Sequence, residues 1–94
     1  MKGRTPTKAE AEHMDRVRDL GCAVCWREHH LYSPAAIHHT KGKTQPGAHF
    51  KVIPLCGAHH QGGYGVGFHA GRKAWEEKFG TQQELLRWVA ERLG

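Results

Sequence analysis

The stretch "IPLCGAHHQGG", residues 53–63, places a cysteine three positions before two adjacent histidines. Two residues separate Cys56 from His59, and this gap lets one tight turn direct both side chains at the same metal ion. The preceding run "FKVIPL" alternates weakly between apolar and polar residues, which predicts a strand leading into Cys56. The stretch therefore predicts half of a metal site at the end of a strand.

A second half-site lies upstream in "GCAVC", where Cys22 and Cys25 have the same spacing. Two such turns supply four N/S ligands, as tetrahedral zinc requires, and leave no open coordination position. The sequence thus predicts a structural Zn²⁺ held by Cys22, Cys25, Cys56 and His59. The spacing favours His59 as the fourth ligand, while the alternatives that remain open are His29, His30 and His60.

The bulk composition is that of a small basic domain. The chain has 94 residues, enough for one domain spanning 1–94 with a marginal core that a bound metal would stabilise. Three cysteines do not make a closed disulfide framework, and no apolar run reaches the ~18 residues of a membrane span. With no secretory apolar region at the N-terminus, we expect a cytoplasmic protein without a membrane partner. A formal charge of +5 and a pI near 9.4 favour a polyanionic partner, nucleic acid first.

The order of predicted elements indicates a small α+β fold. A basic arm (1–6) precedes a helix over 7–20, a core spans 21–80, and an amphipathic helix covers 81–94. Thr7 with Glu10 and Thr81 with Glu84 form capping boxes at the two helix starts. Within the core we expect a Cys-x-x-Cys turn followed by a short loop or strand. Strands at "AAIHHT" and "FKVIPL" would then pair as a hairpin, and a further helix would run from His69 to Gly80.

Several histidines are left over once zinc is saturated. Side chains of adjacent residues point to opposite faces of a strand and diverge by ~100° on a helix. The two side chains of each doublet, His38–His39 and His59–His60, should therefore point to two different sites. One ring of the first doublet, together with His60 and His69, could converge beside the zinc module. Histidines around a metal with open positions, plus one unliganded histidine, would make a hydrolytic centre.

The motif order resembles the HNH nuclease family, which has a ββα-metal (His-Me finger) fold. The resemblance covers about residues 20–80 and is carried by "CAVC", "IHHTKGK", "IPLCGAHHQGGYGVGFHAG" and "AWEEKFG". The glycine-rich segment before the last histidine is most similar to the phage Ref-type, RecA-dependent recombination-enhancement nucleases. This resemblance implies a metal-dependent DNA endonuclease of phage or prophage origin, with DNA and a RecA filament as partners.

The resemblance also assigns roles. The second histidine of the doublet, His39, would be the general base. One catalytic divalent ion, Mg²⁺, Mn²⁺ or Zn²⁺, would be held by His38, His60 and His69. Basic residues flanking this centre in sequence could bind DNA phosphates: Lys41, Lys43, Lys51, Arg72 and Lys73.

The chain departs from the family pattern at the middle Asn. The sequence contains no Asn, and Lys51 occupies the region where the family carries it. A backbone carbonyl could orient the base instead. Two rival interpretations stay open: a non-catalytic zinc-ribbon module that binds nucleic acid, and a degenerate HNH protein.

Overall fold

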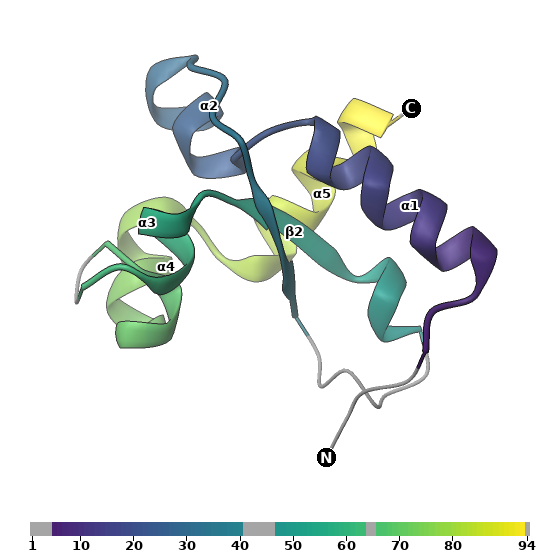
Figure 1. Cartoon of the computed structure of the whole chain (residues 1–94). Coiled ribbons are helices and arrows are strands. Elements are labelled where there is room, and N and C mark those ends of the chain that lie inside the picture. The colour runs from purple at the N-terminus through teal and green to yellow at the C-terminus, as the bar shows by residue number, and fades with distance from the viewer. Residues whose placement is uncertain (1–4, 41–46, 64–65, 94) are drawn as a thin grey trace.

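A two-stranded antiparallel hairpin lies at the centre of the structure (Figure 1). The computed structural model describes residues 5–40, 47–63 and 66–93. Strand β1 (Ala36–His39) pairs with β2 (Val52–Leu55) in a register that places His38 opposite Ile53 and His39 opposite Val52. All four residues of β2 are buried, because helices pack against this strand. The predicted hairpin and the small α+β class are confirmed.

Helix α1 (Lys8–Asp19) begins with the predicted capping box. The Thr7 hydroxyl accepts a hydrogen bond from the Glu10 amide, and the Glu10 carboxylate accepts one from the Thr7 amide. Gly21 follows the helix with φ +80°, a left-handed conformation that glycine adopts without strain. On the buried face, Val17 packs in a small cluster with Val52 of β2 and Val89.

Residues 23–29 form a helix where a loop or short strand was predicted. Helix α2 (Ala23–His29) is capped by Cys22, whose sulfur accepts a hydrogen bond from the Cys25 amide at 3.5 Å. Ala23 and Val24 are fully buried, so tertiary packing stabilises a helix too short to be stable alone. The prediction of a Cys-x-x-Cys turn followed by a short loop or strand was therefore wrong for these residues.

The chain after β2 forms three short elements. Helix α3 (Gly57–Gln61) starts directly after Cys56, and the 3-10 helix η2 (Phe68–Ala70) leads into α4 (Arg72–Phe79). The predicted helix start at His69 was wrong by three residues, because His69 lies in η2 and the extended Gly71 separates η2 from α4. Figure 1 shows α3 and α4 on one side of the hairpin and α1 on the other.

Helix α5 (Gln82–Leu93) joins the two parts of the core. Its predicted start is confirmed, since the Thr81 hydroxyl accepts a hydrogen bond from the Glu84 amide at 3.2 Å. Leu85 packs in the cluster that contains Trp75 and Leu55, whereas Val89 packs in the cluster next to α1. No helix in the described part of the chain has the length and apolar character needed to cross a membrane.

Two candidate metal centres beside the hairpin

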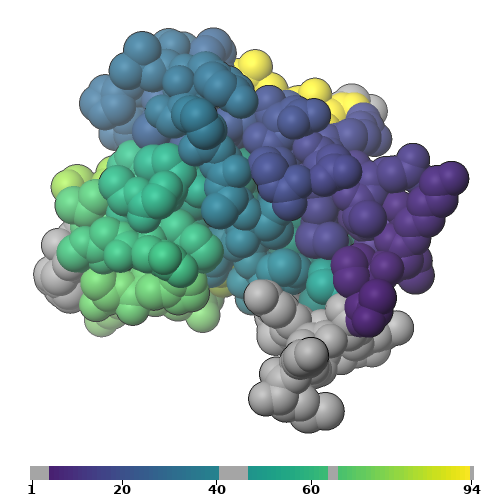
Figure 2. All heavy atoms as spheres, viewed as in Figure 1, coloured from purple at the N-terminus to yellow at the C-terminus, as the bar shows by residue number. Residues whose placement is uncertain are grey.

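The first candidate centre joins the two cysteine half-sites. Cys22 and Cys25 come from the start of α2, and Cys56 and His59 from the start of α3. The Nδ1 atom of His59 lies 3.6 Å from Cys22 Sγ, 3.7 Å from Cys25 Sγ and 3.1 Å from Cys56 Sγ. Cys25 Sγ lies 3.8 Å from Cys56 Sγ. In the space-filling view, blue residues around α2 lie next to green residues around α3 (Figure 2).

These separations fit a zinc ion. Tetrahedral bonds of about 2.3 Å to sulfur and 2.0–2.1 Å to nitrogen put two sulfurs about 3.8 Å apart and a sulfur and a nitrogen about 3.5 Å apart. Burial raises the pKa of the Cys22 thiol to about 12, and a cation at this site would favour the thiolate. The cluster contains His59 and none of His29, His30 or His60. The Cys₃His set that the spacing predicted is therefore the one that the fold assembles.

The second candidate centre is a group of three histidines from three different elements. His38 lies on β1, His60 on α3 and His69 on η2, and one ring nitrogen from each lies within 4.8 Å of the others. The Nε2 atoms of His60 and His69 are 2.9 Å apart. This separation suits neighbouring ligands of an octahedral ion with bonds of about 2.0–2.1 Å.

Gln82 orients the His38 ring. Nε2 of His38 lies 2.9 Å from Oε1 of Gln82, and both side chains are buried. An amide oxygen only accepts hydrogen bonds, so Nε2 carries the proton and Nδ1 keeps the lone pair that a metal would use. Burial lowers the pKa of His38 to about 4, helped by the neighbouring imidazoles of His60 and His69. The ring is therefore neutral near pH 7, as metal ligation requires.

His39 lies on the opposite face of β1 and contacts a histidine that sequence reasoning did not select. Its Nε2 atom is 3.0 Å from Nδ1 of His49, which is buried in the 3-10 helix η1 (Ala48–Phe50). A backbone carbonyl was suggested as a substitute orienting group, and the structure places the His49 imidazole within hydrogen-bonding distance of the His39 ring. The sequence feature that could have indicated His49 is its position just ahead of β2. Gln82 carried no signal at all, because nothing local to it distinguishes it from Gln83.

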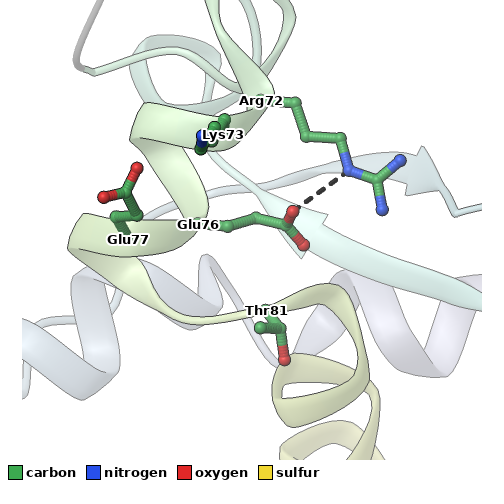
Figure 3. A pocket seen from close by; sticks show the side chains of 5 residues that line it. All are labelled: Arg72, Lys73, Glu76, Glu77 and Thr81. Atoms are coloured by element: carbon green, nitrogen blue, oxygen red, sulfur yellow. Dashed lines mark hydrogen bonds and ion pairs between the residues drawn. The ribbon is translucent and has the colours of Figure 1, made fainter.

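The five predicted phosphate contacts stay predictions. Lys51, Arg72 and Lys73 are exposed, whereas Lys41 and Lys43 lie outside the described residues. Figure 3 shows Arg72 and Lys73 at an open cavity of about 490 Å³ whose other lining residues are Glu76, Glu77 and Thr81. Arg72 Nε is 3.1 Å from Glu76 Oε1, so part of its charge is already balanced within the protein.

The fold and the two clusters together define a class. A hairpin followed by a short helix, with a Cys₃His group able to hold zinc, is the arrangement of a zinc-stapled ββα protein. A comparison with protein families then identifies the group more closely. Residues 6–94 match the model of the family described as "Recombination enhancement, RecA-dependent nuclease", and the chain belongs to this family. The resemblance to Ref-type nucleases seen in the sequence is thereby confirmed.

Proposed function

We propose that this protein is a metal-dependent DNA endonuclease with an HNH-type centre. The observation that carries the proposal is the convergence of His38, His60 and His69 beside the Cys₃His cluster. These side chains come from β1, α3 and η2, and no single local motif requires them to meet. A zinc-ribbon module that only binds DNA would need the Cys₃His group alone and leaves this second cluster unexplained.

The three histidines are proposed to hold one divalent ion through His38 Nδ1, His60 and His69. When bound, the ion would supply positive charge that stabilises the pentacoordinate phosphate of the transition state. Three imidazoles favour borderline transition metals over Mg²⁺ by ligand type. Zn²⁺ is therefore a candidate beside the Mg²⁺ and Mn²⁺ that the family resemblance implies.

His39 is proposed as the general base. It accepts a proton from a water molecule, whose oxygen forms a bond to phosphorus in line with the leaving 3′-oxygen. The P–O3′ bond breaks, the 3′-oxygen takes up a proton from solvent, and the products are a 3′-hydroxyl and a 5′-phosphate. An imidazole suits this step because its ordinary pKa of about 6.5 lies near cellular pH.

The Cys₃His group is proposed to hold a structural Zn²⁺, since four protein ligands leave no position for water or substrate. Lys51, Arg72 and Lys73 are proposed phosphate contacts, with Lys41 and Lys43 as further candidates. Contacts of this kind give affinity without sequence preference. Because the family is RecA-dependent, the proposed substrate is DNA that carries a RecA filament, and intracellular DNA is the expected setting.

A plasmid-cleavage assay tests the proposal. Supercoiled DNA is incubated with Mg²⁺, Mn²⁺ or Zn²⁺, with and without RecA filaments, using wild type, His39→Ala and His29→Ala. His29 is exposed and belongs to neither cluster, so its variant is the matched control. We expect His39→Ala to lose cleavage by at least about 100-fold, as is typical on removing a general base, while His29→Ala retains it. Wild-type protein that cuts DNA in none of these conditions would favour the zinc-ribbon or degenerate HNH interpretation.

A further inference from the structure

The base His39 has a hydrogen-bonding partner in η1 that no motif assigned. We infer that His49 is a positioning residue, which holds the His39 ring so that its Nδ1 atom accepts the proton from water. This inference rests on the proposed role of His39 as general base. The observation that carries the inference is the distance of 3.0 Å between His39 Nε2 and His49 Nδ1.

The two rings meet edge to face, with centroids 5.1 Å apart and planes at 77°. Between two neutral imidazoles, only one of the facing nitrogens can carry a proton. If His39 donates from Nε2, its lone pair is on Nδ1, which can act as the base. If His49 donated instead, the His39 proton would be on Nδ1, and this atom could not accept another. The pair therefore has a productive and an unproductive arrangement.

The backbone around both histidines is fixed independently of the pair. His39 faces Val52 in the hairpin, and the next residue, Thr40, donates to the Lys51 carbonyl from its amide at 3.1 Å and from its hydroxyl at 2.8 Å. Lys51 in turn donates from its amide to the carbonyl of Ala48, which closes the turn of η1. The segment that carries His49 is thus tied to the end of the strand that carries His39.

Burial also holds His49 in place. His49 is only 6% exposed. The 3-10 helix η1 packs against α1, and the centroids of the Phe50 and His13 rings are 5.3 Å apart. After His39 has taken up a proton, Nδ1 of His49 can still accept from its Nε2, which would stabilise the imidazolium. An oriented acceptor behind a catalytic histidine has the same two effects in Ser-His-Asp triads. Here the acceptor is an imidazole and not a carboxylate, and it lies two residues before Lys51, which occupies the region of the family Asn.

Three variants separate positioning from packing. His49→Phe keeps an aromatic ring but removes the acceptor, and His49→Asn and His49→Gln each supply an amide oxygen. We expect His49→Phe to lower kcat by about 10–100-fold, the usual effect of losing a partner that orients a functional histidine. KM for DNA and zinc content should change little, and the Asn or Gln variant should recover part of the rate. In a His39→Ala background, His49→Phe should cause no further loss, because the two residues act as one unit. His29→Phe is the control for an aromatic replacement of an exposed histidine.

Imidazole ¹⁵N–¹H correlation spectra supply a readout that does not depend on cleavage. We expect His39 to carry its proton on Nε2 in the wild-type protein at neutral pH, and His49→Phe to give a mixture of tautomers. A wild-type His39 protonated on Nδ1 would overturn the inference, as would a His49→Phe variant with unchanged tautomer and unchanged kcat. If wild type cuts no DNA, the proposed function fails, and the spectra still decide whether His49 orients His39.

Discussion

At the scale of single residues, adjacent histidines in this chain serve different purposes. His38 and His39 are neighbours on β1, yet His38 points to the three-histidine cluster and His39 to η1. His59 and His60 are neighbours on α3, and they divide between the Cys₃His cluster and the second cluster in the same way. His38 and His39 each have a partner outside β1, which is Gln82 for His38 and His49 for His39.

Replacing Gln82 should weaken the second metal centre without removing a ligand. In Gln82→Leu, Nε2 of His38 loses its acceptor, so the ring no longer favours the tautomer with its lone pair on Nδ1. We expect the affinity for Mn²⁺ to fall by about 10–100-fold, as is typical when such a partner is lost, as measured by calorimetric titration of zinc-loaded protein. Gln83→Leu changes the exposed neighbour on α5 and should leave the affinity unchanged. Equal affinities for the two variants would mean that Gln82 does not orient a ligand.

At the scale of elements, the glycine-rich connection between α3 and η2 determines how His60 and His69 meet. A side chain at Gly67 would overlap the backbone of Gly62, and one at Gly62 would overlap the carbonyl of Ala58. The backbones of Gly62 and Gly67 are therefore in direct contact. This contact lies next to the site where the Nε2 atoms of His60 and His69 are 2.9 Å apart.

Alanine substitutions in this connection should separate close packing from chain flexibility. Gly67→Ala forces the connection apart, so we expect it to weaken Mn²⁺ binding at the three-histidine cluster and to lower the free energy of unfolding by about 1–3 kcal/mol. At Gly63 a Cβ atom would meet nothing within 4 Å, which makes Gly63→Ala the matched control. Calorimetry and chemical denaturation would measure the two effects. Similar losses in both variants would indicate that flexibility, rather than close approach, is what the glycines provide.

At the scale of the whole molecule, the core consists of two modest clusters that β2 and α5 join. One contains Trp75, Ile53 and Leu85, and the other contains Val17, Val52 and Val89. The Cys₃His group lies at the edge of the first cluster, where Cys25 and Cys56 pack against it. Metal binding there would hold α2 against α3, two short helices that have little stability of their own.

Removing zinc should therefore unfold the protein rather than merely inactivate it. Binding of structural zinc is worth about 10–16 kcal/mol in small domains, which equals or exceeds the usual 5–15 kcal/mol stability of a folded chain. We expect a strong chelator, or Cys25→Ser, to abolish the cooperative thermal transition seen by circular dichroism. His69→Ala, which alters only the second cluster, should keep the transition and the bound zinc. A chelated protein that melts at the wild-type temperature would exclude a structural role for the metal.

Features encoded by short spacings were predictable from the sequence. Both capping boxes and both metal half-sites depend on residues three positions apart, and the hairpin strands depend on the alternation of side chains. Local geometry determines where such side chains can point. Helix α2 and the start of α4 were predicted wrongly, because they depend on contacts between distant parts of the chain. In α2 the burial of Ala23 and Val24 stabilises the helix, and burial depends on segments far away in the chain.

The sequence by itself determined the family and the cysteine and histidine residues that could bind metal. It also determined that the two side chains of each histidine doublet point to different sites. Only the tertiary structure decided that Gln82 lies behind His38 and that His49 lies behind His39. His38 and Gln82 are 44 residues apart, and no periodicity links positions at such a distance. Their contact exists because β1 and the start of α5 pack on the same core, so the partner of a buried polar group is a property of the folded chain.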